Sequence, residues 1–409
     1  MSNFLIPFGR GFLEVPYTNN LNVEVIDLPE NQEQDETALI AAAFKKLNFE
    51  KIAGASSIGV VVSDFSRPIP NEKILKVFWT ELKSFDISKN KLCFYIASGL
   101  HKPANQQEIE LILGSYFSKE FKVVVHDARS SVLQRIGVTS RGTPVQINKE
   151  FVKAEVKIVI GSVQPHQIVG YSGGTKSVAI GLGGEEFITS NHSLLTHPAC
   201  KMGNLNNPAR NEIEEVAQMI NLNILINVIL DRKGKIAFIN AGEPEASYKQ
   251  AIDFASSFFS LSATGRKDIV IVSPGGYPKD LNLYQSQKAL NSGARILKPD
   301  GQLILVASCE EGIGNKAFFQ YLKRFTRPDE LLTHFEKEPF RIGPHKAYLW
   351  AQSVKKHKVI LVSKLKKHET RYLMVQSEDN LYSALSHVLN GSKGKVEIGI
   401  IPHASSVML

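Results

Sequence analysis

The sequence predicts an α/β fold made of two α/β domains, with the active site in the cleft between them. Short, continuously apolar runs, typical of strands buried on both faces, alternate with amphipathic segments of helical period. Polar motifs follow directly after several of these runs, and ligands in open α/β sheets bind beyond the carboxyl ends of the strands. The length of 409 residues favours more than one domain.

The amino-terminal part of the chain is expected to begin with short strands over residues 3–28, which cover one edge of a sheet. The strands predicted next are 57–63, 91–97, 121–126 and 155–160, and the helices are 35–47, 71–84 and 105–116. A helix from Asn207-Pro208 to about residue 221, a strand at 222–230, a hairpin turn at 231–234 and a helix at 245–259 follow.

A polar stretch at 260–267 is the predicted linker to a second α/β unit. Its predicted strands are 269–273, 302–307, 359–363 and 395–400, and its helices are 283–292, one near Phe318, 346–356 and 380–389. We therefore expect an amino-terminal domain over residues 1–262 and a carboxyl-terminal domain over residues 268–401. The tail, 402–409, is a candidate for return to the first domain.

The segment from Ser162 to His192 carries the densest set of chemically useful residues. It contains His166, the pair Gly173 and Gly174, Lys176, a second glycine pair, and His192. Glycine allows close approach of the backbone to a ligand, and lysine can pair with phosphate or attack a carbonyl carbon. Taken singly, each of these residues is more often an ordinary loop residue. The run from Gly170 nearly matches a phosphate loop, but Thr175 stands where that pattern needs glycine, so a nucleotide phosphotransferase is only weakly indicated.

Five motifs, in this order along the chain, make the functional prediction more specific. They are Ser-Asp-Phe-Ser-Arg-Pro at 63–68, Ala-Ser-Gly-Leu-His-Lys-Pro at 97–103, the loop at 165–176, Asn-His at 191–192, and Tyr-Gln-Ser-Gln-Lys at 284–288. With them the chain resembles the nickel-dependent lactate racemase family over nearly all its length. Trp350 follows a Gly-Pro-His-Lys-Ala-Tyr run as in that family. Ser66 stands where the family usually has threonine, and both residues carry a hydroxyl.

The resemblance implies nickel and a nickel-pincer nucleotide, a pyridinium thioamide/thiocarboxylate mononucleotide derived from nicotinic acid. Lys176 is similar to the lysine that holds this cofactor through a thioamide, and His192 is similar to the nickel ligand. Soft sulfur donors together with an imidazole suit nickel in planar geometry. The further cofactor-binding residues that the resemblance implies are Asp64, Ser66, Ser172, Gly173 and Gly174. Cofactor-synthesis enzymes are then partners in maturation.

The resemblance also implies a reaction, the inversion of a 2-hydroxy acid. Loss of the Cα hydrogen as a hydride leaves a stable keto acid, but it needs a hydride acceptor and a base for the hydroxyl proton. His101 and His166 are similar to the two bases, one for each face of the substrate, and histidine exchanges protons near neutral pH. Arg67 is similar to the clamp for the substrate carboxylate. Considered alone, each histidine would be a solvated or structural imidazole, and Arg67 an ion-pair partner of Asp64.

The remaining substrate contacts are assigned to the second unit. Gln285 and Lys288 are three residues apart, which places them on one helical face, and they are similar to the substrate-contacting pair of the family. Trp350 is expected to wall the site, although as one of two tryptophans it is otherwise a core residue. A wall of this kind suits a small apolar tail, and we found no definite second cation for a second carboxylate. Lactate is therefore the preferred substrate.

Composition excludes several other classes of protein. The net charge of +8 comes from scattered basic residues, which suits a small anionic substrate and does not indicate nucleic acid. The three cysteines lack metal-ligand spacing and fit a reducing, cytoplasmic location. Residues 1–16 lack the pattern of a signal peptide, and no apolar run is long enough for a membrane span. The main alternative to a racemase is a protein that stores or delivers the nickel cofactor, which would need Lys176 and His192 but not the two bases.

Overall fold

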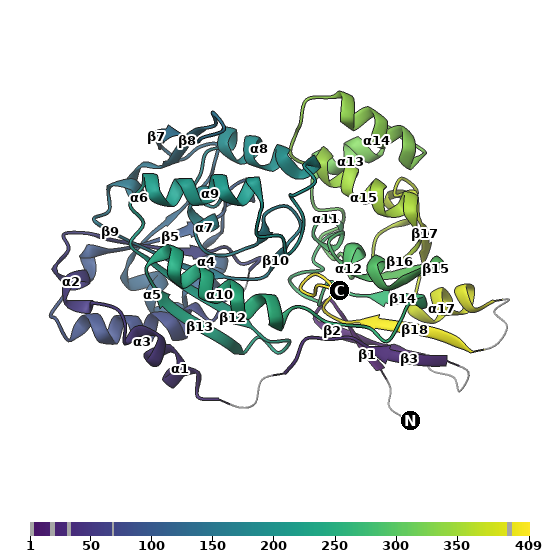
Figure 1. The fold of residues 1–409 in the computed structure, drawn as a ribbon, viewed down its shortest axis with the longest axis horizontal. Coiled ribbons are helices and arrows are strands. Elements are labelled where there is room, and N and C mark those ends of the chain that lie inside the picture. The colour runs from purple at the N-terminus through teal and green to yellow at the C-terminus, as the bar shows by residue number, and fades with distance from the viewer. Residues whose placement is uncertain (1–3, 17–20, 31–33, 68, 391–394) are drawn as a thin grey trace. The chain divides into compact units, whose positions relative to one another are not determined.

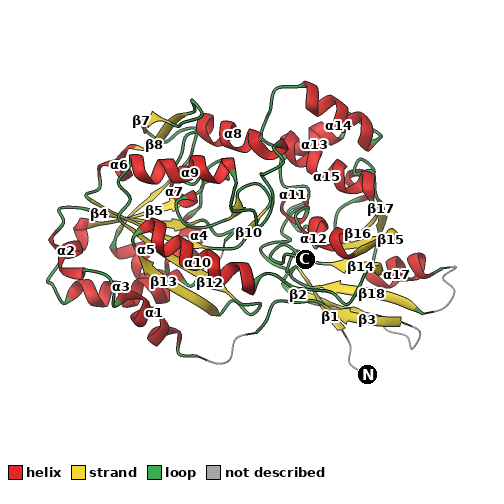
Figure 2. Ribbon diagram, in the orientation of Figure 1, coloured by secondary structure: helices red, strands yellow, loops and turns green. Residues whose placement is uncertain are grey.

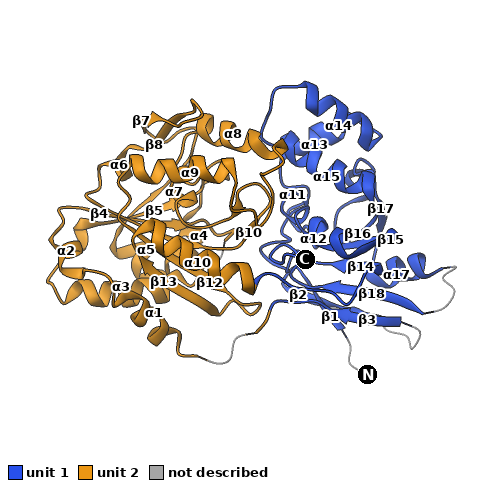
Figure 3. Ribbon diagram, viewed as in Figure 1, with its two compact units in different colours: residues 1–28, 259–409 blue, residues 29–258 orange. Residues whose placement is uncertain are grey.

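The computed structural model describes residues 4–16, 21–30, 34–67, 69–390 and 395–409. The chain forms two compact units (Figure 3): unit 1 contains residues 1–28 and 259–409, and unit 2 contains residues 29–258. Each unit is an α/β structure built around its own sheet (Figure 2), so the predicted α/β class with two domains is confirmed.

Within the described residues, unit 2 contains a six-stranded sheet in the order β13-β12-β9-β4-β5-β6 (Figure 1). The strands are β4 (Ile58–Ser63), β5 (Leu92–Ala97), β6 (Lys122–Val125), β9 (Val156–Ser162), β12 (Ile224–Leu230) and β13 (Ile236–Gly242). All neighbours are parallel except β12 and β13, which form the predicted hairpin. The continuous apolar character of the central strands follows from burial of both faces of the sheet.

The helices of unit 2 are α1 (Glu36–Phe44), α2 (Phe49–Gly54), α3 (Asn71–Lys83), α4 (Gln106–Leu113), α5 (Ser115–Glu120), α6 (Lys149–Lys153), α7 (Lys176–Ala179), α8 (Glu185–Ser193), α9 (Pro208–Met219) and α10 (Pro244–Phe258). Helices α1 to α5 pack their apolar residues on one face of the sheet. On the other face, Phe151 of α6 contacts Tyr95, and α7 contacts β4 and β9.

Unit 2 departs from the prediction at a helix and at a hairpin. The helix predicted over 105–116 is two helices, because Gly114 has a φ of +82° and ends α4 there. The antiparallel hairpin of β7 (Leu133–Val138) and β8 (Pro144–Asn148) was not predicted. Only short, mixed runs of apolar residues mark this hairpin in the sequence.

The strand order of unit 2 reverses direction between β4 and β9. From β4 the chain builds β5 and β6 on one side, and then places β9 and β12 on the other. The register pairs Ser63 with Ala97 and Val62 with Ile160, so the carboxyl ends of β4, β5 and β9 lie next to one another. This reversal is where doubly wound sheets bind ligands.

Among the residues that the structure describes, unit 1 also has a six-stranded sheet, in the order β17-β16-β15-β14-β18-β3, and all of its neighbouring strands are parallel. The strands are β3 (Leu21–Val25), β14 (Lys267–Val272), β15 (Leu297–Val306), β16 (Lys358–Val362), β17 (Gln376–Glu378) and β18 (Val396–Ile401). The hairpin of β1 (Phe4–Phe8) and β2 (Gly11–Val15) precedes them.

The helices of unit 1 are α11 (Leu283–Ser286), α12 (Ala289–Ile296), α13 (Lys316–Leu322), α14 (Pro328–Lys337), α15 (Pro344–Lys356), α16 (Lys367–Thr370) and α17 (Leu381–Leu389). The single helix predicted over 283–292 is divided into α11 and α12, and Gln287 and Lys288 lie between them. No helix of the described residues has the length and apolarity needed to cross a membrane.

The structure differs from the predicted domain division at both ends of the chain. Residues 1–28 belong to unit 1, because β3 pairs in parallel with β18. The tail also stays with unit 1, where Ala404 N donates to Ser273 O at 2.8 Å and Met408 N donates to Phe259 O at 2.8 Å. Pairing between segments so distant in sequence leaves no local pattern. The sequence therefore predicts residues 1–28 in the first domain and leaves the tail only as a candidate for it.

A buried ammonium group makes β3 an integral part of unit 1. The side chain of Lys267 is 1% exposed, and its Nζ lies 2.6 Å from Glu24 Oε2 of β3. Burial opposes ionisation of Glu24, but the hydrogen bonds of Lys267 and Thr264 outweigh it and lower the pKa of the carboxyl. The stabilisation from this pair is therefore present above the unfolded-state pKa of Glu24 and is lost as the pH falls through its folded-state pKa.

We predict that Glu24→Gln lowers the free energy of unfolding by about 1–3 kcal/mol at pH 7, because the buried Lys267 ammonium loses its nearer charged partner and keeps only Glu397, whose Oε2 lies 3.9 Å from Nζ. Urea unfolding followed by circular dichroism measures this change. The matched control is Glu14→Gln on the exposed face of β2, for which we expect less than about 0.5 kcal/mol. An equal effect of the two substitutions would contradict the role given to β3.

Candidate active site

The end of β4 presents a buried carboxylate with fixed partners. Asp64 is 5% exposed. Its Oδ2 lies 2.6 Å from His101 Nδ1, and its Oδ1 accepts hydrogen bonds from the Ser66 backbone N at 3.1 Å and the Ser66 hydroxyl at 2.6 Å. Burial alone would raise the pKa of the Asp64 carboxyl. The charge and hydrogen bond of His101, with help from Ser66 and Arg67, instead hold this pKa at about 2.

This contact determines which nitrogen of His101 is available for chemistry. An ionised carboxylate only accepts hydrogen bonds. Nδ1 of His101 therefore carries a proton and donates a hydrogen bond to Asp64. Nε2 is then the nitrogen that takes up or releases a proton, and the His101 side chain is 45% exposed. A histidine oriented by a buried carboxylate in this way is a common arrangement for a general base.

His166 has the opposite arrangement of its two ring nitrogens. It lies in β10 (Pro165–His166), which pairs with β11 (Gly170–Tyr171). Its Nδ1 accepts the backbone N–H groups of Ile168 at 3.2 Å and Val169 at 3.3 Å. Because Nδ1 is an acceptor, the ring proton of the neutral form sits on Nε2. The small hairpin thus fixes both the position and the tautomer of the imidazole.

Lys176 is the first residue of α7, directly after the glycine-rich turn. Burial lowers the pKa of its amine well below the ordinary value, and the positive charges of Arg67 and Arg210 lower it further, whereas Asp64 opposes the change. A lysine in these surroundings is neutral at a much lower pH than an exposed one. A neutral amine is a nucleophile, so Lys176 is suited to covalent attachment of an acyl-type group.

Two side chains that were not predicted from the sequence, Arg210 and Tyr248, hold the glycine-rich turn in place. Arg210 of α9 donates from Nη1 to the carbonyl of Gly173 at 3.2 Å and stacks on Tyr248 of α10 at 3.9 Å. The Tyr248 hydroxyl donates to Ser172 O at 3.1 Å. Gly174 has a φ of +55°, and a Cβ there would lie 2.7 Å from the Tyr248 ring. No local motif marks Arg210 or Tyr248, since each is an ordinary residue of a helix.

The hydroxyls of Ser66 and Ser172, both predicted to bind cofactor, already form hydrogen bonds within the protein. Ser66 Oγ donates to Asp64, as described above. Ser172 Oγ contacts Ser162 O at 2.9 Å and Gln164 O at 3.2 Å, and accepts from Gln164 N at 3.0 Å. These bonds shape the two loops. A direct contact of either hydroxyl with a cofactor stays a prediction.

His192 lies in the last turn of α8 and is partly buried. The adjacent Asn191 donates to Ala209 O at 2.8 Å and to Glu212 Oε2 at 3.0 Å, which anchors α8 to α9. In the described part of the chain, no three His, Cys, Asp or Glu side chains gather as a metal site. A nickel ion beside His192 would therefore need further donors from an organic cofactor, and a pincer ligand supplies donors of this kind.

A direct backbone contact joins the loop of His101 to the turn between α7 and α8. Gly99 N donates to Gly181 O at 3.0 Å. Gly99 has a φ of +54°, and a Cβ at this position would lie 2.8 Å from Ile180 O. Both the conformation and the lack of space require glycine. The loop with His101 is thus fixed against the segment that connects Lys176 to His192.

The predicted substrate residues of the carboxyl-terminal part lie in unit 1. Lys288 Nζ donates to Gln285 Oε1 at 3.0 Å, so the two side chains are in contact, although Lys288 follows the end of α11 and does not share one helix with Gln285. Trp350 of α15 is 0% exposed, and its Nε1 donates to Leu373 O at 2.7 Å. These contacts fit the core-packing alternative for Trp350 and give no support to its predicted role as a wall of the site.

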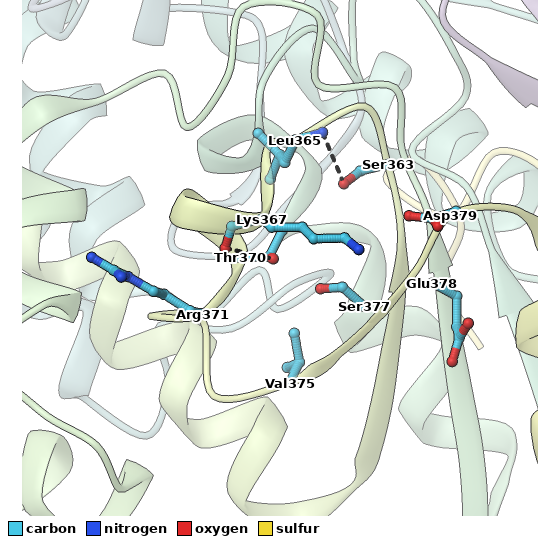
Figure 4. Close-up of a pocket in the computed structure, with 9 residues that line it drawn as sticks. All are labelled: Ser363, Leu365, Lys367, Thr370, Arg371, Val375, Ser377, Glu378 and Asp379. Atoms are coloured by element: carbon cyan, nitrogen blue, oxygen red, sulfur yellow. Dashed lines mark hydrogen bonds between the residues drawn. The ribbon is translucent and has the colours of Figure 1, made fainter.

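Unit 1 also contains a cavity of about 310 Å³ at the carboxyl ends of β16 and β17 (Figure 4). The residues that line it are Ser363, Leu365, Lys367, Thr370, Arg371, Val375, Ser377, Glu378 and Asp379. None of the predicted site residues is among them. Most of its polar side chains are exposed, which is typical of a solvated surface hollow.

A mostly parallel sheet that carries a carboxylate–histidine pair, a second histidine and a lysine of lowered pKa near its strand ends is typical of an α/β enzyme. The chain belongs to the lactate racemase family. The family's amino-terminal domain matches residues 8–203 and its carboxyl-terminal domain matches residues 263–409. The resemblance to this family that the five motifs indicated is thereby confirmed.

Relatives of known name and structure agree with this assignment. The chain is 30% identical to the lactate racemase of Thermoanaerobacterium thermosaccharolyticum, over 87% of this chain and 85% of that protein. It is 31% identical to the lactate racemase of Lactiplantibacillus plantarum, over 77% and 76%. The lactate racemase apoprotein structure from T. thermosaccharolyticum matches with a TM-score of 0.90 and 27% identity, over 100% of this chain and 99% of that one. A Thermotoga maritima protein shares the fold, with a TM-score of 0.71 and 17% identity over 91% and 96% of the two chains.

We predict that Lys176 of the cofactor-free protein reacts with a small acylating reagent at pH 7 faster than Lys249, whose side chain is 76% exposed. The reason is the larger neutral fraction of the Lys176 amine. Arg67→Met removes one repelling charge and should slow labelling of Lys176 about two- to tenfold. Peptide mass spectrometry after a short exposure measures both rates. Preferential labelling of Lys249 would contradict the suppressed pKa of Lys176.

Proposed function

We propose that the protein is a racemase or epimerase of a short 2-hydroxy acid, with lactate as the first substrate to test. The observation that carries the proposal is the group at the strand ends of unit 2, where the buried Asp64 carboxylate orients His101 and also interacts with Lys176, a lysine of lowered pKa. Family membership and the names of the two relatives support the same reaction. Other short acids are expected to react as well, because a hydrophobic pocket discriminates a methylene by only about 1–3 kcal/mol.

In this proposal, separate residues bind the substrate and transfer its hydroxyl proton. Arg67 binds the substrate carboxylate, for which a guanidinium offers two parallel donors. His101, through Nε2, takes the hydroxyl proton of one enantiomer while Asp64 stabilises the positive charge that develops on the ring. His166 performs the same transfer for the other enantiomer. Gln285 and Lys288 stay predicted substrate contacts on the basis of the family resemblance.

Lys176 and His192 would hold the nickel-pincer nucleotide. The lowered pKa of the Lys176 amine would suit covalent attachment of the cofactor, and the His192 imidazole would serve as a ligand of its nickel. When bound, this cofactor supplies the acceptor for the hydride that leaves the Cα atom of the substrate. Arg210 and Tyr248 contribute by keeping the turn before Lys176 in one conformation.

Protein produced together with the pincer-cofactor synthesis enzymes should contain nickel and show the cofactor mass on intact-mass spectra. Lys176→Arg should lack the adduct, because a guanidinium does not form the thioamide. Lys249→Arg is the matched control and should load like the wild type. Wild-type protein without adduct under these conditions would argue strongly against the cofactor assignment.

Loaded protein should racemise L- and D-lactate, as followed by chiral chromatography on a panel of single-enantiomer 2-hydroxy acids. His101→Asn and His166→Asn should each lower kcat by about 10²–10⁴-fold, which is the usual contribution of a positioned acid–base group. Arg67→Lys should mainly raise KM, and the surface change Arg129→Lys is its control. Fully loaded protein that inverts no acid in the panel would favour the storage or delivery alternative.

A further inference from the structure

Three neighbouring strands of unit 2 end in one row of polar residues. The apolar residues that alternate along these strands share one core cluster, and they are Ile58, Val60 and Val62 of β4, Phe94 and Ile96 of β5, and Ile158 and Ile160 of β9. One further step of two residues reaches Asp64, Ser98 and Ser162, respectively. The order β9-β4-β5 therefore places a serine on either side of Asp64, at the point where the strand order reverses.

Both serines are buried, and in the described part of the chain neither hydroxyl is paired. Ser98 and Ser162 are each 3% exposed, and neither Oγ atom has a hydrogen-bond partner among the described residues. A buried hydroxyl without a partner destabilises a folded protein, so most such groups bind something. The contrast with Ser66 and Ser172 is informative, because those hydroxyls are engaged in hydrogen bonds to Asp64 and to the loop backbone.

The charges near this row favour an anionic partner. The lowered pKa of Lys176 shows that Arg67 and Arg210 lie close enough to repel its charge. Arg210 is paired with Glu214. Within the described residues, the carboxylate that acts on both Arg67 and Lys176 is Asp64, which is already engaged with His101 and Ser66. Serine hydroxyls donate well to phosphate and carboxylate oxygens, and such charge-assisted bonds are strong.

We propose that the Ser98 and Ser162 hydroxyls are cofactor-binding groups, which donate to anionic oxygens of the bound mononucleotide on either side of Asp64. This inference rests on the proposed function and adds two residues that neither the motifs nor the resemblance assigned. The shared chemistry is an anionic oxygen, whether it belongs to the phosphate or to the carboxyl-derived arm of the cofactor.

The test compares cofactor-free and loaded protein for Ser98→Ala and Ser162→Ala. In the cofactor-free protein, removal of an unpaired hydroxyl should leave Tm unchanged or raise it by about 1–2 °C. The matched control is Ser172→Ala, whose hydroxyl has three hydrogen-bond contacts and whose loss should lower Tm by about 1–3 °C. Circular dichroism melts give these values.

In the loaded protein, the cofactor should stabilise the two variants less than it stabilises the wild type. The rise in Tm on loading should be smaller than in the wild type by about 1–3 °C, and nickel should be lost on dialysis about 3- to 10-fold faster. The KM for lactate should be unchanged if the hydroxyls bind the cofactor. A raised KM with unchanged nickel retention would instead place them at the substrate and overturn the proposal.

Three further results would overturn the proposal. Variants that gain the wild-type rise in Tm and keep nickel as the wild type does would show that the hydroxyls do not bind the cofactor, while the proposed function stands. A cofactor-free Tm lowered as much as by Ser172→Ala would show that the hydroxyls already have partners in the protein. Absence of the adduct from the wild type would overturn both the proposed function and this inference.

Discussion

The buried carboxylate of Asp64 is the constraint on which the rest of the site depends. A charge taken out of water must be compensated by neighbouring groups, and the loss of one partner from a buried pair is much more costly than the loss of a surface pair. His101, Ser66 and the nearby charge of Arg67 meet this requirement together. Their positions are therefore coupled, because a shift of any one of them leaves Asp64 less well stabilised.

Hydrogen bonds from neighbouring helices and loops hold the segments that carry these residues in position. Arg210 and Tyr248 hold the glycine-rich turn, Asn191 ties α8 to α9, and Gly99 joins the loop of His101 to the turn after α7 through the backbone. None of these residues needs to touch a substrate. Groups that are preorganised in this way do not have to rearrange during the reaction, which is how fixed dipoles and charges contribute most to catalysis.

The sequence predicted most of the parallel strands of both units, because strands buried on both faces have a distinctive apolar pattern. It also placed three motifs at strand ends, and the register brings the ends of β4, β5 and β9 together. It missed contacts that depend on the folded chain alone: the pairing of β3 with β18, the support from Arg210 and Tyr248, and the unpaired hydroxyls of Ser98 and Ser162. For Trp350, burial could not be told from a role in the site, because large aromatic residues serve both.

The membership of residues 1–28 in unit 1 has a consequence for the order of assembly during synthesis. Every strand of the unit 2 sheet has been translated once Gly242 is made, so that sheet can form while most of unit 1 is still missing. Strand β3 leaves the ribosome before any of unit 2, yet its neighbour β18 emerges only after all of unit 2. Such distant pairing is slow to form. Throughout elongation β3 is an unpaired strand that must avoid other partners, and its glutamate and asparagine side chains help to keep it from aggregating.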